Sequence, residues 1–254
     1  MRPSTSIVAP PFPRKAEWVN VATLRMDQQR GKVVLVEFWD FCRVNSLRTL
    51  PYLKAWHERY ADAGLRIVGV HTGGFLPARD PVNVRRAVER LEIPWAVLID
   101  TDLEVWDLYG NQGWPARYVW DRELELHSLH YGEGAYVETE REIQELVGVT
   151  REPLAPLRPE DAPDALIAPQ TEDQPGAYCG PYEAGGVWVV VEGSGELRVN
   201  GRSVAVREPG AICLFDHGRH TRGELDLRAD GVVVHATCFT PGVVPRDRDR
   251  PAAG

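Results

Sequence analysis

The sequence predicts a mixed α/β domain followed by a small all-β module. In the first 147 residues, apolar runs of strand length alternate with helical patterns, in which apolar residues recur every three or four positions. Residues 148–176 then hold six prolines and no apolar period, which indicates a linker or a long surface connection. From Gly185 onward the chain becomes a series of short β runs separated by glycine-containing turns. These three observations divide the chain into two modules.

The module boundaries follow from the same changes in apolar periodicity and proline content. The Pro-rich start, up to about residue 17, is expected to be an extended lead-in. The expected divisions are an α/β domain at 1–148, a Pro-rich linker at 149–176, a β-sandwich or jelly-roll-like module at 177–245 and a disordered tail at 246–254.

The α/β domain is organised around its first long strand and first helix. The apolar run at 33–38 predicts a buried strand, and a short connector leads from Trp39 to Val44. Asn45 is expected to cap a helix that extends to Tyr60. A strand that leads directly into a helix N-terminus forms a place where backbone N–H groups favour an anion or a thiolate.

The remaining elements give the order β-α-β-α-β-α-β-β-α. Gly64 is a good helix C-cap, Asp80-Pro81 predicts a helix start, and Thr101 with Glu104 has the spacing of a capping box. Further strands are expected at 65–71, 95–99, 116–120 and 124–131, and further helices at 81–91, 101–109 and 139–147. Two parallel crossovers followed by a hairpin predict a mixed sheet with helices on both faces. Pro115, just before a strand, is a candidate for a cis peptide.

The second module is expected to be a small antiparallel sandwich or barrel. Asn200-Gly201 is a strong signal for a two-residue hairpin turn. Strands are expected at 187–192, 196–200, 203–206, 211–215, 224–227 and 232–239. Cys213 and Cys238 could face each other from neighbouring strands, so a disulfide between them stays an open alternative to free thiols.

The composition excludes several classes of function. Hydrophobic residues make up 43% of the chain and charged residues 26%, with a net charge of -8. An acidic chain without a basic run is unsuited to nucleic acid or to an anionic membrane surface. No apolar stretch is long enough to span a bilayer, and prolines interrupt the N-terminal segment where a signal peptide needs an apolar core. A cytoplasmic location is therefore expected, and no signal for an oligomeric state is visible.

Five stretches carry a family resemblance across residues 31–147. They are VEFWDFCRVNSLRTLPYLKAWHERY, GLRIVGVHTGGF, NVRRAVERLEIPWAV, DLYGNQGWPARYVWD and HYGEGAYVETEREIQELV. The pattern resembles the thioredoxin fold and, more closely, the redoxin family of the TlpA or AhpC/TSA type. With the C-terminal stretch from Gly185, the chain is most similar to the extracytoplasmic redoxin plus β-module region of DipZ-type cytochrome c biogenesis proteins. The resemblance implies a thioredoxin fold for the α/β domain.

The same resemblance implies where an active site would lie. In the family, the strand-to-helix corner carries Cys-x-x-Cys, whereas here Arg43 takes the first cysteine position and Ser46 the second. Cys42 stands one residue earlier. Dithiol exchange needs an attacking thiolate and a second thiol that releases the mixed disulfide. Glu37 takes the position of the family's buried acid, and Pro115 that of its cis-proline.

These departures predict a degenerate site that binds without dithiol catalysis. Trp39, Trp114 and Pro115 are expected to form an apolar groove for a peptide, a protein thiol or a small ligand, and the Arg43 guanidinium could hold a carboxylate or a phosphate. The alternative is a single-cysteine thiol oxidoreductase or peroxidase, in which the helix start and Arg43 activate Cys42.

A third class of function concerns the β module alone. Trp188 and Tyr182 suggest a carbohydrate- or ligand-binding role, although buried aromatic residues explain them equally well. His217, His220 and His235 invite a metal site, but the first cupin motif, His-x-His, is absent. The four cysteines also lack the spacing of metal ligands. Neither a metal nor a cofactor is therefore expected.

Overall fold

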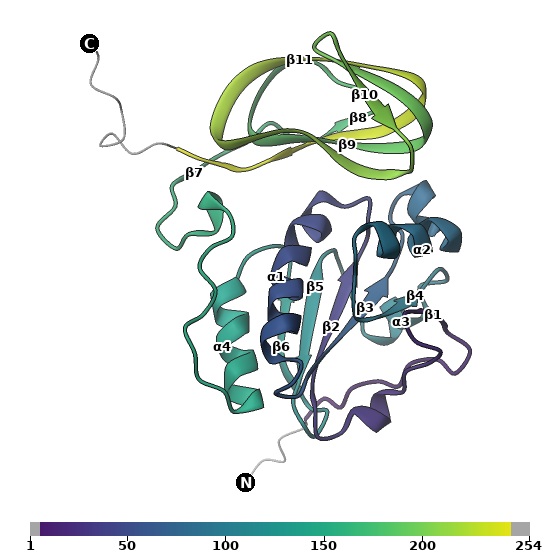
Figure 1. Cartoon of the computed structure of the whole chain (residues 1–254), viewed down its shortest axis with the longest axis vertical. Helices are drawn as coiled ribbons and strands as arrows, with labels where there is room; N and C mark the ends of the chain where they lie inside the picture. The colour runs from purple at the N-terminus through teal and green to yellow at the C-terminus, as the bar shows by residue number, and fades with distance from the viewer. Residues whose placement is uncertain (1–5, 245–254) are drawn as a thin grey trace. The chain divides into compact units, whose positions relative to one another are not determined.

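The computed structural model describes residues 6–244, and the chain divides into two compact units between Leu154 and Ala155. The first unit holds a six-stranded sheet in the order β1-β4-β3-β2-β5-β6 (Figure 1). Its strands are β1 (Glu17–Val19), β2 (Val33–Trp39), β3 (Leu65–His71), β4 (Ala96–Ile99), β5 (Ala116–Trp120) and β6 (Leu126–Tyr131). Its α-helices are α1 (Val44–Tyr60), α2 (Pro81–Arg90), α3 (Glu104–Leu108) and α4 (Tyr136–Val147).

The sheet is mixed, as the order of elements predicts. Strand β2 pairs in parallel with β3, and β3 pairs in parallel with β4, whereas β5, β6 and β1 are antiparallel to their neighbours. Every residue of β2 is buried. Since a central strand loses both faces and both edges to protein contacts, its continuous apolar run is what the sequence pattern predicts.

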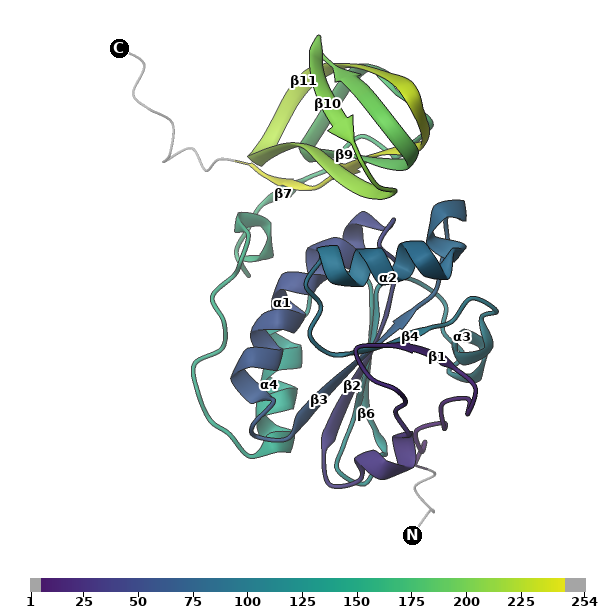
Figure 2. The same cartoon turned by 45° about the vertical axis from the view of Figure 1, so that its right-hand side comes forward.

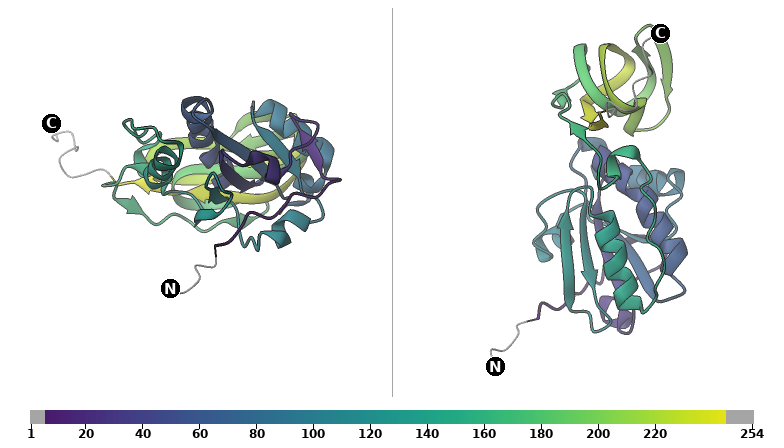
Figure 3. Two further views of the ribbon diagram at one scale, coloured as in Figure 1. Left: turned by 90° about the horizontal axis from the view of Figure 1, so that it is seen from below. Right: turned by 90° about the vertical axis from the view of Figure 1, so that its left-hand side faces the viewer.

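The two faces of this sheet have different contents. Alternate residues of β2, namely Val34, Val36 and Phe38, belong to an apolar cluster that also contains Val105 of α3 and Trp18 of β1. The other face of β2 presents Glu37 and Trp39. Helices α1 and α4 cover this second face, on the opposite side of the sheet from α3 (Figure 2), and they lie side by side (Figure 3).

Two predicted helix caps are wrong. Helix α1 begins at Val44 with Arg43 as its N-cap, so Asn45 already lies inside the helix and no side chain caps it. Thr101 and Glu104 do not form a capping box, because Leu103 is the N-cap of α3. Instead, the Asp100 carboxylate accepts the N–H groups of Val105 (3.0 Å) and Trp106 (2.9 Å). A carboxylate at the end of the preceding strand therefore replaces the local capping pair.

Other boundaries differ by a few residues or add an element. Strand β1 lies at the end of the predicted lead-in, where it forms an antiparallel edge against β4. Strand β6 begins at Leu126 rather than at 124, because Leu124 takes a left-handed conformation in the turn after β5. Helix α4 begins at Tyr136 rather than at 139. Short 3-10 helices occupy Met26–Gln29 and Leu76–Arg79.

The second unit is all β. A four-stranded antiparallel sheet has the order β10-β9-β11-β8, in which β8 is Gln174–Pro175, β9 is Cys179–Val199, β10 is Arg202–Val206 and β11 is Gly210–Thr240. The six predicted strands thus merge into two long, strongly curved strands and one short strand (Figure 2). Register shifts interrupt the pairing of β9 with β11, and such bulges bend a strand. The predicted hairpin at Asn200-Gly201 joins β9 to β10.

Residues 149–176, which the sequence indicates as a linker, contain short elements of their own. A 3-10 helix spans Pro159–Asp161, and β7 (Ile167–Ala168) pairs with β12 (Gly242–Val243). With β8, these pairings extend the β unit toward the N-terminus from residue 177, its expected start. The expected tail at 246–254 lies outside the described residues.

Cys213 and Cys238 lie on either side of β9. Both are paired with Trp188, one from the beginning of β11 and one from its end. Two strand spacings amount to about 9.6 Å, whereas a disulfide needs Cα atoms within about 7 Å. The disulfide alternative is therefore wrong, and none of the four cysteines, which all lie in the described part of the chain, forms a disulfide.

Candidate functional site

The candidate site lies at the corner where β2 ends and α1 begins. Trp39 is the last residue of β2, and Arg43 directly precedes the first residue of α1. The Arg43 N–H donates to the Asp40 carbonyl (3.0 Å), which closes the turn between them. The first turn of α1 contains no acidic side chain, so no carboxylate there compensates the positive end of the helix dipole.

Two aromatic rings hold the Arg43 side chain. Its guanidinium carbon lies 4.8 Å from the centre of the Phe75 ring and 4.9 Å from that of Trp114, within the range of cation–π attraction. Gly74 makes room for it, because a Cβ at that position would lie 2.8 Å from Nη2 of Arg43. The guanidinium is therefore fixed in one place by residues from two segments that are distant from it in the sequence.

Asp40 organises the loop that carries Phe75. Its carboxylate accepts the N–H of Cys42 (2.7 Å) through Oδ1 and the N–H of Gly74 (2.9 Å) through Oδ2. Burial raises the pKa of Asp40 to about 6, against the opposing effect of these bonds and of the nearby Arg43 charge. Its side chain thus joins the corner to the loop that follows β3.

His71 lies behind Asp40 and is neutral. Burial lowers the pKa of His71 to about 3, and its Nε2 accepts the Phe41 N–H at 3.4 Å. The Nε2 atom lies 3.9 Å from Oδ1 of Asp40. Since an imidazole nitrogen that accepts a hydrogen bond carries no proton, His71 supports the turn without forming a charged pair.

The hydroxyl and the thiol of the corner both lie inside the protein. Ser46, at the predicted second-cysteine position, is 1% exposed, and its Oγ accepts the Asp40 N–H at 3.2 Å. Cys42 forms no disulfide within the described residues, and its exposed fraction is 0%. A thiol needs access to its substrate in order to attack it, so the burial of Cys42 speaks against the single-cysteine alternative.

Glu37 lies on the face of β2 that α1 covers, directly opposite Arg117 of β5. Both are 1% exposed. Neither carboxylate oxygen of Glu37 has a hydrogen-bond partner among the described residues, and burial raises the pKa of Glu37 to about 8, with Arg117 acting in the opposite direction. Burial lowers the pKa of Arg117, whose guanidinium lies over the rings of Trp56 and Tyr136. Glu37 is therefore a buried carboxyl that favours its protonated form at neutral pH.

The three residues of the expected groove separate into two groups. Trp39 is 1% exposed, so its indole packs in the core and offers no surface to a ligand. Trp114 is half-buried, donates its indole N–H to Oγ1 of Thr72 (2.7 Å) and contacts the Trp106 ring at 4.5 Å. The Trp114–Pro115 peptide is cis, as the sequence analysis anticipates. Of the expected groove, Trp114 remains at the surface beside Arg43.

Three residues of the corner are missing from the sequence-based site. Asp40 holds the backbone of the loop at Gly74. Thr72 positions Trp114, and Phe75 positions Arg43. The signal that could have found two of them is the Thr-Gly-Gly-Phe run directly after β3. Because β2 and β3 are parallel neighbours, the loops at their carboxyl ends meet at one edge of the sheet.

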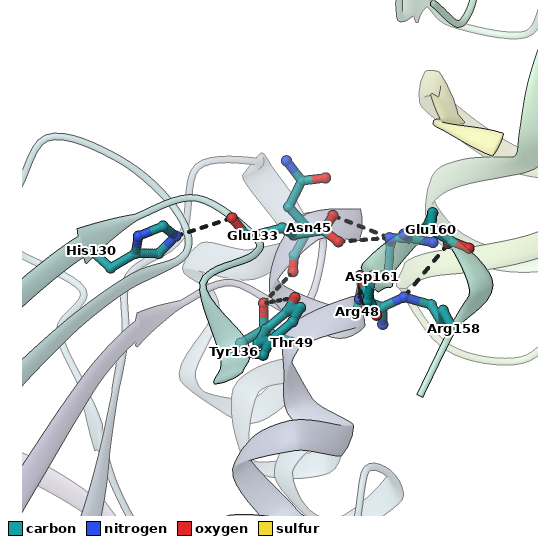
Figure 4. Close-up of polar contacts among 9 residues, drawn as sticks. All are labelled: Asn45, Arg48, Thr49, His130, Glu133, Tyr136, Arg158, Glu160 and Asp161. Carbon is teal, nitrogen blue, oxygen red and sulfur yellow. Dashed lines mark hydrogen bonds and ion pairs between the residues drawn. The ribbon is translucent and has the colours of Figure 1, made fainter. Parts of the chain in front are cut away.

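The start of α1 is also anchored from its other side (Figure 4). Nε of Arg48 contacts both carboxylate oxygens of Glu133, at 3.1 and 2.9 Å. Oγ1 of Thr49 donates to the Asn45 carbonyl (2.9 Å) and lies 3.5 Å from the Tyr136 hydroxyl.

The second unit contains a separate cluster of charges. Arg158 forms ion pairs with Glu160 and Asp161, which stabilise the 3-10 helix at Pro159–Asp161 (Figure 4).

The three histidines considered as metal ligands each contact a different side chain. His217 contacts the Tyr182 hydroxyl (3.0 Å), His220 contacts Glu183 (3.0 Å) and His235 contacts Glu192 (2.8 Å). Within residues 6–244, no three His, Cys, Asp or Glu side chains gather as metal ligands would. In the same range, no helix is both long and apolar enough to cross a bilayer.

The mixed sheet, the helix that begins at its carboxyl edge and the cis-proline beside that helix define a thioredoxin-like domain. Residues 8–128 match the sequence model of the AhpC/TSA family. This part of the chain therefore has a thioredoxin-like fold and is similar to the AhpC/TSA family, in agreement with the resemblance stated from the sequence.

Individual proteins agree with this assignment. The protein DipZ of Mycobacterium tuberculosis is 30% identical over 163 residues, which are 61% of this chain and 24% of that protein. SUPPRESSOR OF QUENCHING 1 of Arabidopsis thaliana is 36% identical over 131 residues, which are 51% of this chain and 12% of that protein. The chain thus spans a quarter or less of the length of these relatives.

A solved structure shows the same fold. A chain from Chlorobium tepidum, titled as a thiol:disulfide interchange protein DsbE, superposes with a TM-score of 0.51 at 19% identity. The superposition covers 56% of this chain and 97% of that chain. At this level of identity the likeness concerns the fold, and it supports the thioredoxin architecture of the first unit.

Proposed function

We propose that the first unit is a member of the thioredoxin-like thiol-disulfide oxidoreductase family that binds a ligand or a protein without dithiol catalysis. The supporting observation is the clamped guanidinium of Arg43 at the start of α1, three residues before the buried Ser46 hydroxyl. The sequence contains no Cys-x-x-Cys. Exchange between a dithiol and a disulfide needs two thiols within reach of each other, and this corner offers one buried thiol.

The partner would be a peptide, a protein thiol or a small ligand at the exposed edge formed by Arg43 and Trp114. Trp114 presents an aromatic surface that Thr72 and Trp106 hold in place. Rigid aromatic side chains bind with little loss of conformational entropy. A cytoplasmic location, and the absence of nucleic acid and membrane partners, stay predictions from the acidic composition and from the N-terminal sequence.

Disulfide reduction and peroxide consumption test the catalytic part of this proposal. We expect the 254-residue chain to reduce insulin disulfides and to consume hydrogen peroxide no faster than free thiol controls. We expect Cys42→Ser to leave both rates unchanged, because the Cys42 thiol is buried. A natural protein that accelerates either reaction, together with a Cys42→Ser variant that loses it, would establish the single-cysteine oxidoreductase or peroxidase instead.

Peptide binding tests the other part. In a titration followed by NMR, a ligand at the corner should shift the indole N–H signal of Trp114, which donates to Thr72. The indole signal of Trp18, which lies in the apolar cluster on the other face of the sheet, serves as the internal control. Ligands that shift only signals of the β unit would contradict a binding site at this corner.

A further inference from the structure

We infer that the Arg43 guanidinium binds a carboxylate group of the ligand. The inference rests on the proposed function and deepens it by naming the ligand's chemical class. Arg43 lies beside Trp114, the half-buried aromatic residue of the corner. A carboxylate-bearing ligand could therefore place its anionic group on Arg43 and its apolar part on Trp114.

The guanidinium is ordered before any ligand arrives. The rings of Phe75 and Trp114 hold it at 4.8 and 4.9 Å, and Trp114 is itself fixed by Thr72. A free arginine side chain loses substantial rotamer entropy when it binds. Here folding has already imposed that loss, so the side chain is preorganised for binding.

The guanidinium is also left without an ion pair among the described residues. The Asp40 carboxylate is near enough for the Arg43 charge to lower its pKa, but its two oxygens accept the N–H groups of Cys42 and Gly74. The Arg43 Nε is buried and has no hydrogen-bond partner in the described part of the chain. A buried donor without a partner is costly. Because Nε lies against Gly74, a ligand would bind the outer nitrogens of the guanidinium, whose charge is not matched by an ion pair among the described residues.

The start of α1 adds further donors on the same side. The first N–H groups of a helix have no acceptor within the helix. In α1 no side chain caps them, and the first turn contains no acidic residue. Since α1 is 17 residues long, its dipole reinforces the attraction of Arg43 for an anion.

The charge and shape of the site favour a carboxylate over a phosphate. Aromatic rings contact the guanidinium on its faces, and Gly74 lies against Nε and Nη2. The edge formed by the two terminal nitrogens is therefore the one left for a ligand, and its two N–H donors match the two oxygens of a carboxylate. A phosphate carries nearly two charges at neutral pH and would call for a second cation. Arg48, the next arginine along α1, already binds Glu133.

N-acetyl-leucine and its neutral amide test this inference on the 254-residue chain. We expect the Trp114 indole signal to report binding of the acid about tenfold tighter than binding of the amide, with an affinity that falls as salt is added. Arg43→Gln should abolish the difference between acid and amide, and Arg43→Lys should keep part of it. The matched control is Arg86→Gln, because Arg86 is an exposed arginine of α2, and it should bind both compounds as the natural protein does.

The same titration contains the results that overturn the inference. Equal binding of acid and amide, no binding of the acid, tighter binding of inorganic phosphate, or an unchanged preference in Arg43→Gln would each do so. Equal binding at Trp114 leaves the proposed function standing, whereas disulfide reduction by the natural protein removes the proposed function itself. The peptide Ac-Leu-Glu-NH2 distinguishes an acidic side chain from a chain-terminal carboxylate, and tight binding of either carboxylate supports the inference.

Discussion

The two faces of the six-stranded sheet differ in how well their buried polar groups are partnered. The face toward α3 is an apolar cluster in which Tyr118 directs its hydroxyl to Asn111 (3.2 Å), and only the Trp120 indole N–H lacks a partner among the described residues. The face toward α1 buries Glu37 and Arg117 with most of their polar atoms unpartnered. The indole N–H groups of Trp39 and Trp56 lack partners there as well.

This difference indicates that the sheet face toward α1 is not optimised for stability. An unpartnered buried polar group costs about 1–3 kcal/mol, and a charged one costs more. Apolar residues of similar volume would remove that cost, as they do on the opposite face. The costly face is the one that supports the start of α1, and functional sites are where such local conflicts are expected.

The largest effect should come from restoring two sulfurs to the corner. We expect Arg43→Cys combined with Ser46→Cys to reduce insulin disulfides on the order of a hundredfold faster than the natural protein. The two residues are three positions apart at the start of α1, so their side chains lie on one face of the helix. Ser46→Cys alone, which lacks the attacking thiol, is the control. An inactive double variant that still folds would mean that the scaffold has lost more than its thiols.

A partnered buried carboxylate should behave differently from Glu37. Glu140 of α4 accepts the Tyr60 hydroxyl (2.5 Å) and the Leu154 N–H (2.7 Å), and it lies 3.4 Å from a guanidinium nitrogen of Arg59. We expect Glu140→Gln to lower the free energy of unfolding by about 3 kcal/mol, because charge-assisted bonds are lost inside the protein. Urea denaturation at neutral pH measures it. A loss no larger than that of an exposed Glu145→Gln control would contradict this contrast.

Replacing the unpartnered carboxyl of Glu37 should raise the free energy of unfolding rather than lower it. The pKa of Glu37 is about 8 in the folded protein and about 4.3 in the unfolded chain. The unfolded chain therefore loses its proton first, and the stability contributed by Glu37 falls as the pH rises between these two values. We expect Glu37→Gln to be more stable than the natural protein by up to about 5 kcal/mol near pH 9, as these two pKa values imply, and almost equal to it near pH 4.

Urea denaturation across this pH range measures the effect of Glu37. The difference between the two proteins should grow steadily up to about pH 8 and then level off. Arg117, which faces Glu37 across the β2–β5 pair, is the charge that opposes the shift. Parallel curves for the natural protein and Glu37→Gln would show that Glu37 is already ionised in the folded state.

The smallest expected effect lies on the apolar side of the sheet. Asp100 accepts the N–H groups of Val105 and Trp106 at the start of α3. We expect Asp100→Ala to cost about 1 kcal/mol, the usual value of a helix cap, and to change ligand binding at Trp114 less than Arg43→Gln does, because Asp100 reaches Trp114 only through Trp106. Thermal unfolding and the NMR titration measure the two outcomes. A loss of binding in Asp100→Ala would indicate that the two faces are coupled.

Much of the fold could be predicted from the sequence, because strands and helices leave local periodic signals. The runs at 33–38 and 65–71 and the turn at Asn200-Gly201 are signals of this kind, and the structure places β2, β3 and the β9–β10 hairpin there. The helix caps failed because local spacing competes with distant partners. Asp100, at the end of β4, takes over from the Thr101–Glu104 pair.

The same distinction, between local signals and distant partners, applies to the residues of the candidate site. The absence of Cys-x-x-Cys, and the positions of Arg43, Ser46, Glu37 and Pro115 in the family pattern, can be read from the residues alone. The contacts of Arg43 with Phe75 and Trp114, the burial of Cys42 and Trp39, and the pairing of Glu37 with Arg117 without a hydrogen bond appear only once the chain is folded. Residue types and their spacing are properties of the chain. Burial and contacts between residues 43, 75 and 114 arise when separate loops meet at one edge of the sheet.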